Sequence, residues 1–429
     1  MQKTKHSRTF YLTLVIFSLV GQIAWVMENM YLNVFLYDRF AASAEAISAM
    51  VGASSLAATV TTLLIGALSD KLGKRKIFIC GGYICWGVSI WSFAAINELA
   101  PAAAAGAAAA SLGISLVIVM DCVMTFFGSA ANDASFNAWL TDSTDSTNRG
   151  TAEGINSMMP MLAILVVFGG AMFLDQESSG YWNIIFGIIG TVVLVLGFAG
   201  FFLIQDARVD TSANGSWVAN LLYGFRPRVI AGNRTLYLTL ASYALFGISI
   251  QTFMPYLILY YTVSLGMDNY VLIFAPAIVL AAAFTFFYGR IYDRRGFRFA
   301  VLPSMALLMA GYVLLYFCRG TAMVFIGTLT MLCGYLSGMA VFGAMLRDHT
   351  PENKAGMFQG QRIIGQVLIP GIIGPAIGAA VLKNADTIVN TDGTTSFIPN
   401  EKIFLAAFIA GIVTWLVLIP LFRLAKKEN

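Results

Sequence analysis

The chain has 429 residues, of which 58% are apolar and only 11% are charged, whereas soluble proteins carry about 25% charged residues. A soluble chain of this length could not bury so much apolar surface in two or three cores, which excludes a soluble enzyme, a nucleic-acid-binding protein and a disordered scaffold. The formal net charge of +4 is expected to reflect orientation in a membrane. The composition therefore predicts an all-α integral membrane protein.

Apolar runs bounded by charged residues, glycine, proline or polar clusters predict twelve transmembrane helices. Twelve spans of about 20 residues would use roughly 240 apolar positions, close to the roughly 249 present. The spans are expected near residues 10–37, 46–69, 77–96, 111–141, 155–174, 181–204, 235–262, 270–289, 299–318, 321–346, 357–382 and 402–424.

Basic residues are distributed unevenly between the two sides of this arrangement. With a cytoplasmic N-terminus, the 26 Lys and Arg residues fall in cytoplasmic segments with four exceptions, Arg39, Arg319, Lys383 and Lys402. This asymmetry predicts a multi-pass protein of the cell (plasma or inner) membrane with both termini in the cytoplasm.

The longest internal connection divides the predicted spans into two sets of six. The expected parts are an N-terminal bundle at 1–204, a cytoplasmic linker at 205–233 and a C-terminal bundle at 234–429. Arginines alternate with apolar residues such as Trp217 in the linker. This pattern is consistent with a short amphipathic piece on the membrane surface or with a partly ordered tether.

Two loop motifs occur once in each half. The turn after the second span is GALSDKLGKRK and the turn after the eighth is GRIYDRRGFR. The segments after spans four and ten are AWLTDSTDSTNRGTAEG and AMLRDHTPENKAGMFQG. The residues that carry these patterns are Gly66, Asp70, Gly73, Lys74, Arg75 and Asp142 in the first half, and Gly289, Asp293, Gly296 and Asp348 in the second. A duplicated six-helix unit is the usual architecture of a secondary transporter.

The first loop motif resembles the signature of the major facilitator superfamily. The resemblance implies two pseudo-symmetric six-helix bundles and a cytoplasmic gate. Gly66 and Gly73 are expected to allow close helix approach and a tight turn. Asp70 is expected to accept hydrogen bonds from a neighbouring helix N-terminus, and Lys74 or Arg75 to pair with Asp142. The alternative is an ordinary solvated loop that carries orientation charges.

Three acidic residues fall within predicted spans: Glu28, Asp121 and Asp133. Acids in spans are costly and are candidates for function by default. No Lys, Arg or His lies mid-span to pair with them, so they are expected to face a wet cavity or to carry a proton. Such groups suit proton coupling.

Polar residues recur on one side of several spans. In the fourth span, Asp121, Thr125, Ser129, Asp133 and Asn137 follow a four-residue spacing. Amides and aromatic rings of this kind suit a polyhydroxylated solute, although serine and threonine also serve as hydrogen-bonding contacts between helices. The predicted solute contacts are Gln22, Trp25, Asn29, Asn33, Gln251 and Tyr256.

The segment NDASFNAWLTD is similar to the fourth span of the glycoside–pentoside–hexuronide cation symporters, which implies an acid at the position of Asp133. That branch carries paired aspartates in the second span, where this chain has Ala58 and Thr62. The departure puts sodium coupling in doubt and leaves the proton as the expected coupling ion.

The sequence therefore predicts a proton-coupled symporter of a small polar solute, with a sugar or glycoside as the expected class. A proton-coupled drug or metabolite efflux antiporter is the alternative, because GIIGPAIGA in the eleventh span is similar to an antiporter motif. A uniporter, a channel or a sensor on the same scaffold is a further possibility. No cofactor, metal site or enzymatic activity is expected, and a monomer in a lipid bilayer is predicted.

Overall fold

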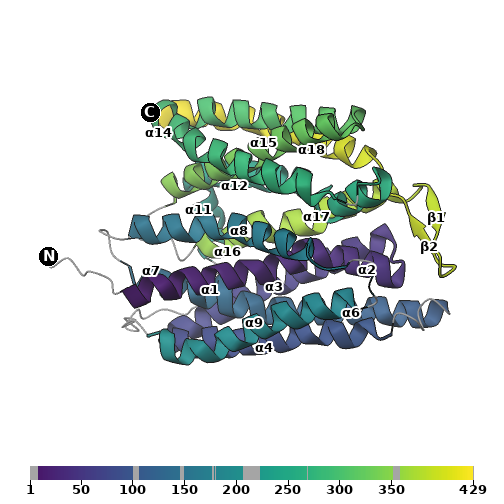
Figure 1. Cartoon of the computed structure of the whole chain (residues 1–429). Helices are drawn as coiled ribbons and strands as arrows, with labels where there is room; N and C mark the ends of the chain where they lie inside the picture. The colour runs from purple at the N-terminus through teal and green to yellow at the C-terminus, as the bar shows by residue number, and fades with distance from the viewer. Residues whose placement is uncertain are drawn as a thin grey trace. The chain divides into compact units, whose positions relative to one another are not determined.

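The computed structural model describes residues 8–99, 106–144, 149–175, 178, 180–205, 223–267, 269–350 and 358–428 (Figure 1). Twelve helices of the described residues are long and apolar enough to cross a membrane. Each overlaps one of the predicted spans, so the predicted all-helical fold with twelve spans is confirmed. Residues 206–222 lie outside the described residues, and with them most of the predicted linker.

The helical segments of the first half include two π-helical stretches, η1 and η2. In chain order they are α1 (Arg8–Val26), η1 (Met27–Tyr31), α2 (Leu32–Phe40), α3 (Ala44–Leu72), α4 (Arg75–Asn97), α6 (Ala107–Gly128), η2 (Ser129–Phe136), α7 (Asn137–Asp142), α8 (Arg149–Ala171) and α9 (Tyr181–Leu203).

The second half has two further π-helical stretches, two short 3₁₀ turns and a small hairpin. In chain order its elements are η3 (Tyr223–Phe225), α11 (Pro227–Gly232), α12 (Arg234–Gln251), η4 (Met254–Tyr256), α13 (Leu257–Leu259), η5 (Tyr260–Ser264), α14 (Val271–Phe317), α15 (Thr321–Asp348), α16 (Gln359–Ile363), η7 (Ile364–Leu368), α17 (Ile369–Leu382), β1 (Thr387–Val389), β2 (Thr395–Phe397) and α18 (Lys402–Glu428).

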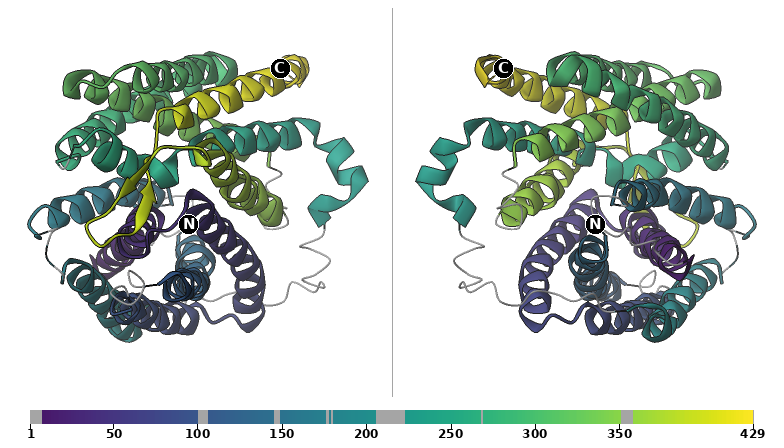
Figure 2. Two further views of the ribbon diagram at one scale, coloured as in Figure 1. Left: turned by 90° about the vertical axis from the view of Figure 1, so that its right-hand side faces the viewer. Right: turned by 90° about the vertical axis from the view of Figure 1, so that its left-hand side faces the viewer.

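The chain forms two compact units. Unit 1 comprises Met1–Ala42, Leu56–Asn214 and Thr391–Thr394, and unit 2 comprises Ser43–Ser55, Gly215–Asn390 and Thr395–Asn429. In unit 1, α4 packs against α6 and α9, and α1 packs against α8. In unit 2, α14 packs along α15, and α12 contacts α17 and α18; Figure 2 views these helices roughly end-on.

The longest helix, α14, contains two of the predicted spans. It is interrupted at Gly296, whose φ of 76° and ψ of 178° are not helical. Glycine adopts a positive φ without the steric cost of a Cβ. The non-helical Gly296 therefore separates two spans that follow each other within one long helical element.

The hairpin of β1 and β2 is a feature that the sequence did not predict. Its strands are antiparallel, with Thr387 opposite Phe397 and Val389 opposite Thr395. In Figure 1 it extends beyond the ends of α17 and α18. Each strand has only three residues, too few to show a two-residue alternation, although Asp392–Gly393 between them is a turn signal of hairpins.

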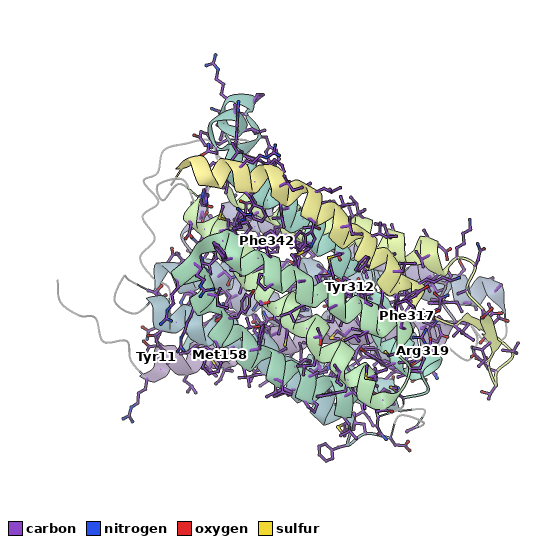
Figure 3. The ribbon with its side chains drawn as sticks, turned by 90° about the horizontal axis from the view of Figure 1, so that it is seen from above. Tyr11, Met158, Tyr312, Phe317, Arg319 and Phe342 are labelled. Atoms are coloured by element: carbon purple, nitrogen blue, oxygen red, sulfur yellow. The ribbon has the colours of Figure 1, made fainter. Side chains whose placement is uncertain are left out.

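Aromatic rings fill the interior of unit 2. The ring of Phe342 stacks on that of Tyr243 with centroids 5.4 Å apart. The hydroxyl of Tyr312 lies 3.0 Å from Ser249 Oγ. Figure 3 shows Phe342, Tyr312, Phe317 and Arg319 in this order along the unit, and Arg319 forms an ion pair of 3.0 Å with Glu401 at the end of the helices.

Small residues set the closest helix contacts. A Cβ added at Gly87 of α4 would lie 2.6 Å from the backbone nitrogen of Leu194 and 2.7 Å from the backbone oxygen of Gly190 in α9. Glycine at such positions lets two helix backbones approach each other inside a membrane. The packing of α4 against α9 therefore depends on Gly87.

We expect Gly87→Ala to destabilise the protein by about 1–3 kcal/mol, because neither backbone atom can move away from the added methyl group. Thermal unfolding of the purified protein in detergent measures the effect. Gly81→Ala is the matched control on the same helix, because no atom lies within 4 Å of its added Cβ. Alanine is a better helix former than glycine, so the control should be neutral or slightly stabilising. Equal melting temperatures for the two variants would contradict this account of the contact.

Candidate functional site

The three acids predicted within spans all belong to unit 1. Glu28 lies in the π-helical stretch η1, Asp133 lies in η2, and Asp121 lies in α6. π-helical turns are rare and are frequently found at functional sites. Two of the three acids, Glu28 and Asp133, therefore lie in π-helical stretches of unit 1.

Glu28 is buried, with 7% of its surface exposed. Its Oε1 accepts a hydrogen bond of 2.8 Å from the hydroxyl of Thr125, in the fourth span. Its Oε2 is buried and has no hydrogen-bond partner among the described residues. Asp121 and Asp133 lie within electrostatic range of it. No described basic side chain forms an ion pair with Glu28, so one oxygen remains available to a proton or a solute.

Asp133 is half-buried and accepts a hydrogen bond of 3.0 Å from Ser129 Oγ at its Oδ2. The side-chain amide of Asn137 donates to the backbone oxygen of Asp133 at 3.1 Å. In an α-helix, residues four apart drift slowly around the axis. The wider turns of η2 reverse that drift, which brings polar residues from Thr125 to Asn137 back towards one side.

The predicted solute contacts of unit 1 line one helix but differ in exposure. Trp25 packs on Trp86 with ring centroids 5.1 Å apart, and its Nε1 points at Asn132 Oδ1 at 3.4 Å. Gln22 is half-buried, Asn29 is exposed, and Asn33 is buried. The amides of Asn29 and Asn33 each donate to the backbone oxygen four residues earlier, at 2.8 Å. The polar atoms of Asn29 and Asn33 that take no part in these hydrogen bonds belong to the same span as Glu28.

The two predicted solute contacts of unit 2 are packed more tightly. The hydroxyl of Tyr256 donates to the backbone oxygens of Ala44 at 2.9 Å and Pro375 at 3.2 Å, and its ring is fully buried. A Cβ added at Gly374 would lie 2.5 Å from Cβ of Gln251. Contact between Tyr256 and a solute would therefore require its present hydrogen bonds to break.

The predicted loop contacts converge on Arg75, the first residue of α4. Its Nη2 lies 2.5 Å from Asp70 Oδ1, and its Nε lies 3.0 Å from Asp142 Oδ2. Its Nη1 donates to Ser69 Oγ at 2.6 Å. Arg75 is 4% exposed, whereas Asp142 is 23% and Asp70 is 65% exposed. The predicted pairing with Asp142 is made by Arg75, while Lys74 is exposed.

One contact of this loop differs from expectation. Gly73 has a φ of 62° and forms the expected tight turn between α3 and α4. Among the described residues, no atom lies within 4 Å of a Cβ added at Gly66, and the close helix approach expected at Gly66 stays a prediction. Asp70 contacts the guanidinium of Arg75, whereas a neighbouring helix N-terminus was expected. An arginine that opens the next helix supplies the positive charge more strongly than a helix dipole does.

The second copy of the loop has different chemistry. The hydroxyl of Tyr292 donates to Asp348 Oδ2 in unit 2. Arg298, which corresponds to Arg75 in the repeat, lies over the ring of Phe422 at 5.6 Å from its centroid. The side chain of Asp293 lies outside the described part of the structure. The repeat thus retains an aspartate at the end of the tenth span but replaces its arginine partner with a tyrosine.

The sequence analysis missed one half-buried cation. Arg362 lies near the start of the span Gly360–Leu382, and its Nε is buried without a hydrogen-bond partner among the described residues. Tyr243 and Arg347 lie within electrostatic range of it. The sequence contained the signal, because Arg362 falls inside the predicted span 357–382. The sequence analysis counted Arg362 among the basic residues that set the orientation of the protein in the membrane.

A family model described as Major Facilitator Superfamily matches residues 10–375 of the chain. No curated protein matches the chain in sequence. The likeness to solved structures extends over nearly the whole chain at low sequence identity, so it shows the fold alone.

Three solved structures illustrate this likeness. The nucleoside transporter NupG is 15% identical, with a TM-score of 0.69, and 96% of this chain and 98% of that chain are covered. A D-xylose–proton symporter is 12% identical with a TM-score of 0.72, covering 95% and 97%. A bacterial homologue of the human lysosomal transporter Spinster, in an inward-facing and occupied conformation, is 14% identical with a TM-score of 0.71, covering 97% and 98%.

The loop geometry predicts unequal effects of neutralising its two aspartates. Asp142→Asn should cost about 2 kcal/mol, because it removes the less exposed of the two charges that face a buried guanidinium. Asp70→Asn should cost about 1 kcal/mol or less, because its carboxylate is largely hydrated. Thermal unfolding of the purified variants compares them, with Lys74→Gln as the exposed control. A larger loss for Asp70→Asn than for Asp142→Asn would contradict this ranking.

Proposed function

Since the chain belongs to the Major Facilitator Superfamily, we propose that this multi-pass membrane transporter carries a small polar solute in symport with protons. A sugar or glycoside is the proposed solute class. The bundles at 1–204 and 234–429 would alternate access to the solute about the linker at 205–233. The proposed setting is the cell (plasma or inner) membrane, with a monomer whose termini both lie in the cytoplasm.

The observation that carries the proposal is the environment of Glu28. This carboxyl is buried, has a single described hydrogen-bond partner in Thr125, and has two further acids within electrostatic range. A buried carboxylate without a cation is costly in a medium of low dielectric constant. Binding and release of a proton at Glu28 would change this cost, which gives the proton a means of acting on the conformation of unit 1.

Asp133 is the second proposed coupling acid, with Asp121 as a third. Ser129 holds one oxygen of Asp133, and the residue is more accessible than Glu28. A half-buried acid next to a buried one offers a route by which a proton can pass from water to the interior. The three acids would then share a proton within unit 1.

The proposed solute class rests on the side chains near these acids. Trp25 offers an aromatic face, and Gln22, Asn29 and Asn33 offer amides that donate and accept hydrogen bonds with hydroxyl groups. Gln251 and Tyr256 are the proposed contacts of unit 2, on the condition that the hydroxyl of Tyr256 is released. The fold likeness includes a D-xylose–proton symporter and a nucleoside transporter, whose solutes both carry a sugar.

We propose that the loop contacts form a cytoplasmic gate. Arg75 ties the turn after α3 to the end of the fourth span through Asp142, and Gly73 supplies the tight turn. In unit 2, Asp348 and Tyr292 make the corresponding tie. Asp293 stays in the proposed gate on the strength of its motif. Gly66 and Lys74 are included in the proposed gate only because they match the loop motif.

The alternative of an efflux antiporter rested on the glycine and proline residues of α17. Added Cβ atoms at Gly374 and Gly378 would meet Gln251 and Tyr256, at 2.5 Å and 2.6 Å. Close packing within unit 2 accounts for these glycines without reference to efflux. The symport proposal is therefore preferred.

Glu28→Gln and Asp133→Asn should each abolish accumulation of the solute against its gradient, because the amide cannot carry the coupling proton. Purified protein in proteoliposomes with an imposed inward proton gradient measures accumulation, with labelled D-xylose, glycosides and nucleosides as the probe panel. Exchange of internal for external solute without a gradient should persist in both variants, since it does not require net proton movement.

Asp386→Asn is the matched control, because Asp386 is exposed between α17 and β1. It should accumulate solute as the unmodified protein does. Wild-type accumulation by both Glu28→Gln and Asp133→Asn would overturn the coupling proposal. Uptake that ignores the proton gradient in the unmodified protein would favour a uniporter or channel, and export of a lipophilic drug would favour the antiporter.

A further inference from the structure

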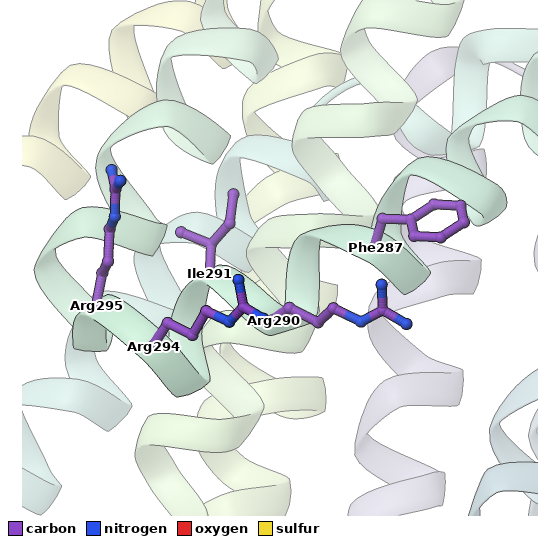
Figure 4. Close-up of a pocket in the computed structure, with 5 residues that line it drawn as sticks. All are labelled: Phe287, Arg290, Ile291, Arg294 and Arg295. Carbon is purple, nitrogen blue, oxygen red and sulfur yellow. The ribbon is translucent and has the colours of Figure 1, made fainter.

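An open cavity of about 420 Å³ lies on α14 of unit 2. Its lining consists of Phe287, Arg290, Ile291, Arg294 and Arg295, which we call the arginine patch (Figure 4). Three guanidinium groups within six residues give this surface a strong positive charge. The patch is separate from the acids of unit 1 and has no part in the proposed coupling.

The guanidinium groups of the patch are exposed, and no described carboxylate forms an ion pair with them. The Cζ atom of Arg290 lies 5.4 Å from the ring centroid of Phe287 and 5.8 Å from that of Phe286. Figure 4 shows Arg290 extending towards Phe287. These cation–π contacts hold one guanidinium beside an aromatic surface and leave its hydrogen-bond donors free to face outwards.

An exposed apolar stripe leads along α14 to the patch. Its members recur at spacings of three or four residues, which places them on one face of the helix. The stripe consists of Leu272, Pro276, Val279, Leu280, Ala283, Phe286 and Phe287, and the next exposed residues along the same face are Arg290 and Arg294. Phe286 is 70% exposed and Phe287 is 60% exposed. The face therefore changes from apolar to basic within one turn, as expected where a helix leaves the hydrocarbon core.

We propose that the arginine patch binds the headgroup of an anionic phospholipid, whose acyl chains lie along the apolar stripe. The phosphate diester receives hydrogen bonds from Arg290 and Arg294, whose planar guanidinium groups match its oxygen geometry. Arg295 adds positive charge to the same cavity. Basic pockets of this kind at the cytoplasmic side of transmembrane helices bind anionic headgroups.

The stripe identifies the ligand as a lipid, because a free phosphate or a soluble anion would use the charges and ignore Phe286, Phe287 and the residues before them. The charge selects an anionic headgroup over a zwitterionic one, because a headgroup amine would lie next to three guanidinium groups. Arg298, which lies over Phe422 in α18, adds positive charge at the same end of unit 2.

The test uses the full-length protein, purified and incorporated into phosphatidylcholine vesicles that contain about one quarter phosphatidylglycerol. Native mass spectrometry after detergent extraction counts the phosphatidylglycerol molecules that stay bound. Arg290→Gln combined with Arg294→Gln should weaken retention by about fivefold for each arginine removed. Lys383→Gln combined with Lys402→Gln is the matched control, because these lysines are also exposed and the charge change is equal.

Retention equal to that of the unmodified protein is expected for the control pair. Equal retention by the two double variants would overturn the proposal, because it would mean that net charge alone recruits the lipid. Displacement of phosphatidylglycerol by added inorganic phosphate would also overturn it, since the patch would then bind a soluble anion. Phe287→Ala keeps every charge and should still reduce retention, and circular dichroism of each variant verifies that the helices are intact.

Discussion

In the hydrocarbon core of a bilayer there is no water, so each backbone amide must find its hydrogen bond within the protein. The described part of the chain meets this constraint with twelve helices. Where it departs from the α-helical ladder inside a span, it does so with π-helical turns, which keep the amides bonded but change which side chains share a face. Glu28 and Asp133 both lie in such turns, so the backbone itself sets how the two acids are presented.

Burial of charge follows a related rule in the loop of unit 1. Arg75 is almost fully buried, and it retains its charge at low cost because Asp142, Asp70 and Ser69 surround it. Glu28 has no such neighbours among the described residues and accepts one hydrogen bond from Thr125. A charge with matched partners stabilises a single arrangement, whereas a charge without them favours exchange with a proton. Under the proposed function, Arg75 would hold one conformation of this unit and Glu28 would change it.

The sequence was sufficient for the spans, because a span needs only about 20 consecutive apolar residues. The pairing of Arg75 with Asp142, 67 residues away, was expected from the resemblance of the loop motif to the superfamily signature. Contacts between distant helices were harder to foresee. The backbone hydrogen bonds of Tyr256 and the π-helical turns at Glu28 and Asp133 are products of packing, which leaves no fixed spacing in the chain. Arg362 was visible in the sequence, but only the structure shows that its Nε is buried without a hydrogen-bond partner among the described residues.

The two halves repeat each other in sequence and differ in how their charges are used. In unit 1, the loop arginine faces two carboxylates; in unit 2, Tyr292 takes the aspartate, and Arg298 lies on an aromatic ring. A hydrogen bond from a phenol to a carboxylate contains one formal charge, so it is screened less by salt than an ion pair is. The arginines of unit 2 that are not used internally remain on the surface beside the apolar stripe. The repeated aspartate at the end of spans four and ten is thus held by a cation in unit 1 and by an uncharged phenol in unit 2.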